Sequence, residues 1–184
     1  MKGHLIIFSG PSGVGKDTLL EAWAERNPRV KKVTAYTTRA PREGEANGQD
    51  YHFVDRDTFD RLAQEGAFLE FKEVYGNGYA TPNQGVDDLL VAGELAILKI
   101  DVQGALEAME KRPDALSIFI LPPSTEELER RIRDRATDSP EQIKKRLDNA
   151  LLEIEIGAKY HFRVVNDQVD SAIEELEAIV KQHG

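Results

Sequence analysis

The chain has 184 residues, a length that suits one folded domain and is short for two independent ones. Its 24 basic and 33 acidic residues give a net charge of −9, which argues against nucleic-acid and anionic-membrane partners. The absence of cysteine excludes disulfides, thiolate metal ligands and a cysteine nucleophile. No apolar run is long enough for a secretion signal or a membrane span, so we expect a cytoplasmic protein. Composition leaves monomer and homo-oligomer equally open.

Strand-like and helix-like patterns alternate along the chain. The apolar residues 5–8 lead through a glycine-rich loop into a helical pattern around residues 19–24. Apolar runs at residues 95–101 and 116–121 are each followed by a helical pattern, and a short run at 162–166 precedes a C-terminal amphipathic helix. Continuous apolar strands alternating with helices predict an α/β fold with a parallel sheet flanked by helices.

Two segments interrupt this alternation. Residues 34–82 are rich in glycine, charge and aromatic side chains, with strand-like pieces "YHFV" and "FLEF" around a helix near residues 57–64, and we expect an inserted subdomain. Residues 126–149 are densely charged and predict two exposed helices joined near residues 138–140. We therefore predict one domain with a discontinuous core of residues 1–33, 83–125 and 150–184.

The stretch "FSGPSGVGKDT" lies between the first strand and the first helix. A glycine-rich loop in this position aims backbone N–H groups and the positive end of the helix at one point, which suits a polyphosphate. Lys16 can reach the β and γ phosphates of a nucleotide. An ordinary glycine turn with a surface lysine is the alternative, and the flanking strand and helix disfavour it. The predicted ATP-binding residues are Gly10, Pro11, Ser12, Gly13, Val14, Gly15, Lys16, Asp17 and Thr18.

Asp17 departs from the usual loop, which has a serine or threonine there to bind magnesium. Thr18 is the first hydroxyl after the lysine, as in the "GKGT" of many nucleoside monophosphate kinases. One hypothesis puts Thr18 at the phosphate and Mg²⁺, with Asp17 meeting the metal through water. The alternative is that Asp17 only compensates the helix dipole.

A second anion site is indicated by "TTRAPREGEANGQDYHF", which carries Arg39, Arg42 and Tyr51. Two guanidinium groups and a phenol suit a small phosphate, because arginine forms bidentate charge-assisted hydrogen bonds. A solvated basic loop is the alternative.

Together with the glycine-rich loop, this stretch resembles the guanylate kinase family, whose pattern reads "TTR.PR.GE..G.DY.F". The resemblance continues in order through "FLEF", "GNGYAT", "IDVQG", "ILPPS", "RIRDRATDS" and "VVND", so it covers essentially the whole chain. It implies a P-loop NTPase core, an insertion at residues 34–82 that binds GMP, and a lid at residues 126–149. It also implies transfer of the γ-phosphate of ATP, with Mg²⁺, to GMP or dGMP in nucleotide salvage.

The resemblance also implies roles for individual residues. Glu70 and Asp101 match carboxylates that accept from guanine N1 and N2, which suits the donors on that edge of the base. For these two residues alone, a strand-surface charge and a helix cap are the alternatives. The implied GMP-binding set is Arg39, Arg42, Tyr51, Glu70, Tyr79, Thr81, Asp101, Gln103 and Gly104. The implied catalytic set is Lys16, Arg39, Arg131, Arg135 and Arg146. The lid arginines have an alternative role in ion pairs on a solvated helix face.

Three positions depart from the family pattern. Ala35 replaces a common serine that donates towards guanine O6, Gly78 replaces an aromatic residue, and Ala136 replaces a glycine of the lid. Two competing functions therefore stay open. A ribose 1,5-bisphosphate phosphokinase would not need Glu70 and Asp101, and a scaffold domain that binds phosphopeptides without catalysis would not need Lys16.

Overall fold

A five-stranded parallel sheet forms the centre of the molecule. The computed structural model describes residues 2–134 and 139–183. The strand order is β2 (Val30–Lys32), β7 (Leu95–Lys99), β1 (His4–Ser9), β8 (Leu116–Leu121) and β9 (Phe162–Val165), and all pairs are parallel. The predicted α/β class is thus confirmed, and so are the four strands expected from apolar runs. The three-residue strand β2 was not predicted.

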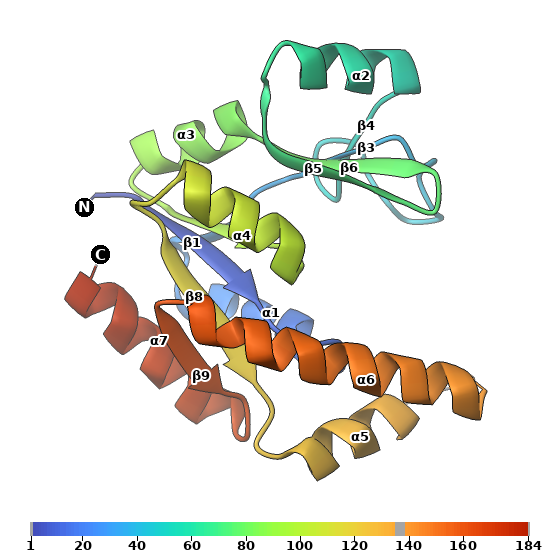
Figure 1. Cartoon of the computed structure of the whole chain (residues 1–184). Helices are drawn as coiled ribbons and strands as arrows, with labels where there is room; N and C mark the ends of the chain where they lie inside the picture. Colours follow the sequence, from blue (N-terminus) through green and yellow to red (C-terminus); the bar gives the residue numbers. More distant parts are fainter. Residues whose placement is uncertain (1, 135–138, 184) are drawn as a thin grey trace.

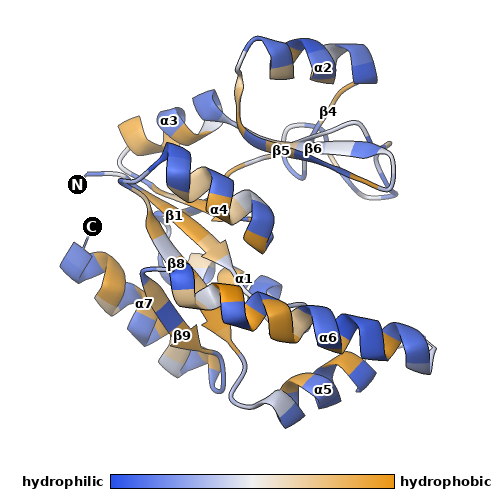
Figure 2. Cartoon of the chain, viewed as in Figure 1, coloured by the Kyte–Doolittle hydropathy of each residue, from blue (hydrophilic) through white to orange (hydrophobic). Residues whose placement is uncertain are grey.

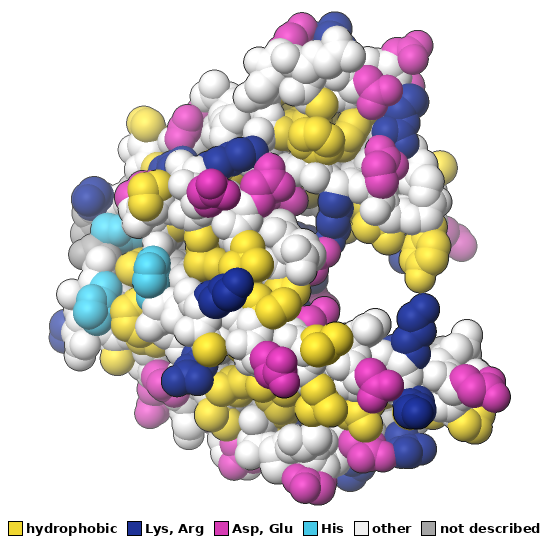
Figure 3. Space-filling model, viewed as in Figure 1, with side chains coloured by type: hydrophobic (Ala, Val, Ile, Leu, Met, Phe, Trp, Pro, Cys, Tyr) yellow, Lys and Arg dark blue, Asp and Glu magenta, His cyan; other side chains and the backbone are white. Residues whose placement is uncertain are grey.

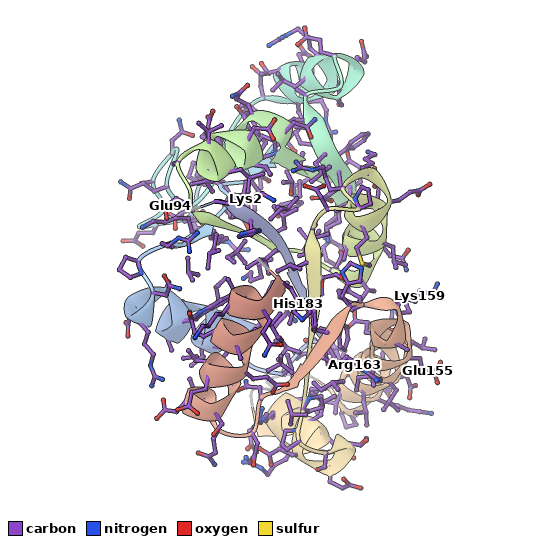
Figure 4. The ribbon with its side chains drawn as sticks, turned by 90° about the vertical axis from the view of Figure 1, so that its left-hand side faces the viewer. Lys2, Glu94, Glu155, Lys159, Arg163 and His183 are labelled. Atoms are coloured by element: carbon purple, nitrogen blue, oxygen red, sulfur yellow. The ribbon has the colours of Figure 1, made fainter. Side chains whose placement is uncertain are left out.

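Helices cover both faces of this sheet, as its apolar strands require (Figure 2). Along β1, Ile6 and Phe8 face one hydrophobic cluster, whereas Leu5 and Ile7 face another. The first cluster includes residues of α1 (Lys16–Arg26) and α7 (Val169–His183), and the second those of α3 (Asn83–Val91) and α4 (Val102–Lys111). Figure 4 shows the side of the molecule where Lys2 and Glu94 lie, shortly before β1 and β7 begin, with His183 at the end of α7.

A smaller sheet lies within residues 34–82. Its order is β4 (His52–Phe53), β3 (Tyr36–Thr37), β6 (Asn77–Pro82) and β5 (Phe68–Val74). Helix α2 (Arg56–Gln64) covers it through the buried Phe59, which packs in a cluster with Phe68 and Ala80. The predicted pieces "YHFV" and "FLEF" contribute β4 and the start of β5, while β3 and β6 were not recognised as strands.

The charged segment forms the two predicted helices, α5 (Thr125–Asp134) and α6 (Pro140–Ile156), followed by the short helix η1 (Gly157–Lys159). They pack together through Leu128, Ile132 and Ala150. A capping box of Ser139 and Gln142 begins α6. This helix pair and the smaller sheet project from the same side of the main sheet (Figure 1). No helix in the described part of the chain is long and apolar enough to span a membrane.

Gly78 provides a test of packing in the smaller sheet. A Cβ atom added there would lie 2.7 Å from Cζ of Phe59, whose ring is 1% exposed. We predict that Gly78→Ala lowers the free energy of unfolding by about 1–3 kcal/mol through overpacking. Urea denaturation measures this loss. In a Phe59→Leu background the added methyl should cost less, and equal costs in both backgrounds would locate the strain elsewhere.

Candidate active site

A cavity of about 400 Å³ opens beyond the carboxyl ends of β1 and β7, between the main and the smaller sheet. Figure 3 shows the molecule hollowed on this side, between the smaller sheet above and the helix pair below. Ligands of parallel α/β sheets bind at this end of the strands. The cavity is lined by Gly10, Ser12, Lys16, Ala35, Tyr51, Glu70, Lys72, Tyr79, Ala80, Thr81, Lys99, Ile100, Asp101 and Glu153.

The glycine-rich loop joins β1 to α1 at the floor of this cavity. Gly13 and Gly15 have φ of 84° and 91°, a left-handed backbone that favours glycine. Gly15 is the N-cap of α1 and supplies no side-chain acceptor, so the first N–H groups of the helix suit an anion. The Lys16 ammonium folds back and donates to the carbonyls of Gly10 at 2.5 Å and Pro11 at 3.1 Å. Burial lowers the pKa of Lys16.

Thr18 lines a smaller cavity of about 170 Å³ with the loop residues. Asp17, in the first turn of α1, forms an ion pair with Lys99 at the end of β7. Burial raises the pKa of Asp17, but the hydrogen bond and charge of Lys99 outweigh burial and leave the pKa below its usual value. Asp17 therefore lies where a negative charge compensates the helix dipole, and it also pairs with the Lys99 ammonium.

Glu70 is buried at 4% exposure, so it is not a strand-surface charge. One of its carboxylate oxygens accepts from the Thr81 hydroxyl at 2.6 Å. A Cβ atom at Gly104 would lie 2.8 Å from the other oxygen, so glycine leaves room for this carboxylate. Burial raises the pKa of Glu70, and the Thr81 hydrogen bond opposes that rise.

Asp101 caps a helix, as one of the two alternatives predicted, and its position in the cavity is compatible with the other. It is the N-cap of α4, with Oδ1 accepting from the Gly104 N–H at 2.9 Å, and it also lines the main cavity. Its other oxygen pairs with Lys72, which was not predicted. Glu70 and Lys72 are two residues apart on β5, so their side chains share one face of the strand. That spacing is the signal that could have identified Lys72.

The predicted phosphate clamp is partly assembled. The Arg39 guanidinium lies 5.5 Å from the Tyr51 ring centre and pairs with Glu45 through contacts of 2.9 and 3.0 Å. This pairing lowers the pKa of Glu45 to about 2. The ring centres of Tyr51 and Tyr79 are 6.0 Å apart, and both rings line the cavity. The Arg42 side chain is exposed, and its backbone N–H donates to Glu45 at 2.8 Å.

Three predicted GMP-binding side chains lie outside the lining of the main cavity. The described lining residues do not include Arg39, Arg42 or Gln103, and Gln103 is exposed on α4. Gly104 is buried and contributes its N–H to Asp101 and its lack of a side chain to Glu70.

Two arginines of the predicted lid reach the glycine-rich loop. Arg131 donates to the Val14 carbonyl at 3.3 Å and to the Asn166 carbonyl at 3.4 Å, while Glu127 holds its Nε at 2.8 Å. Arg146 donates to the Ser12 hydroxyl at 3.2 Å. They are thus not restricted to a solvated helix face. Arg135 lies outside the described residues, and so does Ala136.

The described residues offer individual oxygen donors for a metal ion and no ligand cluster. In residues 2–134 and 139–183, no group of three or more His, Cys, Asp or Glu side chains could hold a metal ion. Thr18 and Asp17 at the start of α1 supply oxygen donors beside the loop. Such a donor set fits Mg²⁺ that arrives with a nucleotide, because magnesium is usually bound by one or two protein oxygens plus substrate phosphates.

A phosphate-binding loop at the end of the central strand of a parallel sheet makes this protein a P-loop NTPase in fold. Residues 2–183 match the profile of the family described as guanylate kinase. The chain therefore belongs to the guanylate kinase family. A guanylate kinase of Alkalilimnicola ehrlichii is 46% identical over 179 residues, which cover 97% of this chain and 88% of that protein.

Further relatives agree with this membership. A guanylate kinase of Trichormus variabilis is 45% identical over 175 residues, covering 95% of this chain and 88% of that protein. The crystal structure of guanylate kinase from Anaplasma phagocytophilum matches with a TM-score of 0.72 at 36% identity. That match covers 98% of this chain and 86% of that one.

The pair formed by Thr81 and Glu70 can be tested through stability. Thr81→Val removes the donor of a buried carboxylate and should cost about 1.5–3 kcal/mol of unfolding free energy. The hydrogen bond lowers the Glu70 pKa, so its loss raises that pKa further and destabilises the ionised form. The cost in unfolding free energy should therefore be full above the raised Glu70 pKa of the variant. It should shrink as pH falls from that pKa through the lower pKa of the wild type. Urea denaturation from mildly alkaline to mildly acidic pH measures this, and Thr81→Ser, which keeps the hydroxyl, is the control. A pH-independent cost would contradict the assignment.

Proposed function

We propose that this protein transfers the γ-phosphate of ATP to GMP, forming ADP and GDP. Membership of the guanylate kinase family supports this reaction. The observation that carries it is one cavity lined both by Lys16 of the P-loop and by the carboxylates Glu70 and Asp101. A phosphate donor and a guanine base can thus be held in a single space.

ATP binds on the loop of residues 10–18 in this proposal. Backbone N–H groups and Lys16 hold the β and γ phosphates, and Arg131 and Arg146 close over them. A cavity of about 370 Å³ on the other side of the loop suits the nucleoside, and its lining includes Arg131 and Asn166. Thr18 and Asp17 are the residues for Mg²⁺, which when bound neutralises charge on the β and γ phosphates.

GMP or dGMP binds between the two sheets. Its phosphate is held by Arg39, Arg42, Tyr51 and Tyr79. To bind the phosphate, Arg39 has to leave its ion pair with Glu45. The base lies against a second group of residues, whose carboxylates accept from the N1–H and N2–H₂ donors of guanine. That base-binding group is Glu70, Thr81, Asp101, Gln103 and Gly104.

Catalysis then depends on alignment and charge neutralisation. Phosphoryl transfer needs little covalent chemistry from side chains, so cations brought to a fixed loop are sufficient. We propose that residues 34–82 and the lid of residues 126–149 close on a core of residues 1–33, 83–125 and 150–184. Closure excludes water from the donor and acceptor phosphates.

The competing functions are less well supported. A ribose 1,5-bisphosphate phosphokinase would have no use for a buried glutamate with a hydroxyl partner in the acceptor cavity. A phosphopeptide-binding scaffold would have no use for a P-loop lysine directed at the loop carbonyls.

Lys16 is the first residue to test. Lys16→Ala should lower kcat by at least about a hundredfold, the scale of one preorganised electrostatic contact, while circular dichroism stays unchanged. Lys31→Ala is the matched control, because Lys31 is exposed on β2 and is not part of the cavity lining. Near-normal turnover of ATP and GMP by the purified Lys16 variant would refute the P-loop assignment.

Base recognition gives the second test. AMP has no amino group at C2 and an unprotonated N1, so it would leave Glu70 and Asp101 desolvated without donors. Each unsatisfied group costs about 1–3 kcal/mol or more, so GMP should exceed AMP by orders of magnitude in kcat/KM. Glu70→Gln should reduce that ratio. Ala35→Ser places a hydroxyl in the cavity. It should raise kcat/KM for GMP by the equivalent of one hydrogen bond, about 0.5–1.5 kcal/mol.

Steady-state kinetics with both nucleotides measures these ratios. Glu70 does not read the base if Glu70→Gln leaves the GMP to AMP ratio unchanged. Equal use of AMP and GMP by the wild-type protein would refute guanine recognition altogether.

A further inference from the structure

Lys99 is placed at the mouth of the P-loop by the pairing of two core strands. It is the last residue of β7, and its register partner on β1 is Phe8, just before the loop begins. Its side chain is 26% exposed and lines the main cavity beside Lys16. The P-loop sequence pattern does not include this lysine, because it follows the loop by more than eighty residues; its partner Asp17 is 82 residues away.

The ion pair with Asp17 explains little of this placement by itself. The Asp17 side chain is 72% exposed, and exposed ion pairs contribute about 0–1 kcal/mol to stability. Meanwhile Lys99 and Lys16 line the same cavity, so both ammonium-bearing side chains border one space. Two ammonium groups on one cavity wall repel each other, and a bound anion between them removes that cost.

Lys99 lies on the acceptor side of the loop. It shares the main cavity with Tyr51 and Tyr79, the proposed partners of the GMP phosphate. The described lining of the small loop cavity around Thr18, and that of the cavity beside Asn166, do not include it. Its ammonium pairs with Asp17, which lines the small loop cavity, so Lys99 lies at the border between the proposed donor and acceptor sites.

We propose that Lys99 is a second phosphate-binding lysine of this active site, specific for the phosphoryl group in transit. This inference rests on the proposed GMP kinase reaction. In the free protein Asp17 holds the Lys99 ammonium, and the polyphosphate replaces Asp17 when both nucleotides bind. The same exchange is available to Arg39, which Glu45 holds in the free protein.

The chemistry needs no proton from Lys99. The bond between the γ-phosphorus and its bridging oxygen breaks, a GMP phosphate oxygen bonds to that phosphorus, and ADP leaves with the electron pair. Charge spreads over the oxygens of the transferred group, and a cation fixed beside them stabilises the transition state.

The test compares ligands that do and do not span the two sites. Isothermal titration calorimetry with magnesium measures the affinity for ADP, for GMP, and for adenosine and guanosine joined by a pentaphosphate. Lys99→Met should weaken binding of the joined ligand by about tenfold or more, the effect of one charge-assisted contact, and weaken ADP and GMP clearly less. It should lower kcat more than it changes either KM. Lys99→Arg should retain most of the affinity, and Lys31→Met should match the wild type.

The ion pair between Asp17 and Lys99 is tested by a double-mutant cycle. Magnesium is left out, so that a contact of Asp17 with the metal does not contribute to the measured affinity. Asp17→Ser should raise the affinity for the joined ligand when Lys99 is present. It should have no such effect in the double variant that also carries Lys99→Met. Unchanged affinity in Lys99→Met would overturn the proposal. Equal weakening of all three ligands together with a lower Tm would also overturn it, because Lys99 would then only shape the loop. Failure of the wild-type protein to phosphorylate GMP would refute the proposed function instead.

Discussion

Positive charge has to be gathered at one edge of the parallel sheet, because a chain with a net charge of −9 can attract phosphates only locally. The fold does this with cations from distant segments, and each has an internal partner. Lys16 donates to loop carbonyls, Arg39 pairs with Glu45, and Lys99 pairs with Asp17. These partners hold the long side chains in place, and the proposed phosphate contacts require each cation to exchange its partner when a ligand binds.

The part of the cavity proposed to bind the base depends on a buried carboxylate. Glu70 is buried, and it is positioned by the Thr81 hydroxyl and by the space that Gly104 leaves. A buried carboxylate with a fixed orientation favours ligands that bring donors and penalises those that do not. In the proposed reaction, selectivity thus depends on a buried side chain, whereas phosphate binding depends on exposed segments such as the loop around Arg42.

The two-sheet arrangement connects these parts. Strand β5 carries Glu70 and Lys72 towards the cavity, and Lys72 reaches Asp101 at the start of α4 in the core. The smaller sheet is therefore linked to the main one by an ion pair within the proposed base site. Packing of Phe59 against Gly78 sets how closely α2 can approach β6, and hence the shape of that sheet.

Local sequence patterns determined the elements whose signal is contained in a few neighbouring residues. The apolar runs of β1, β7 and β8 and the glycine-rich loop belong to this kind, because a strand buried on both faces must be continuously apolar. The edge strand β9, in which only Val164 is buried, was also found from its short apolar run. The family resemblance added the carboxylates Glu70 and Asp101. Strands β2, β3 and β6 were not found. β2 and β3 have only three and two residues, and Gly78 interrupts β6, so none of them shows a hydrophobic periodicity.

Only the tertiary structure decided how charged side chains are paired. Lys72 meets Asp101 across 29 residues, and Lys99 meets Asp17 across 82. Such contacts depend on strand order and register, which bring together segments that are remote in sequence. Neither composition nor local periodicity contains that information, because a lysine on a strand has the same pattern whether its neighbour in space is water, a carboxylate or a phosphate site.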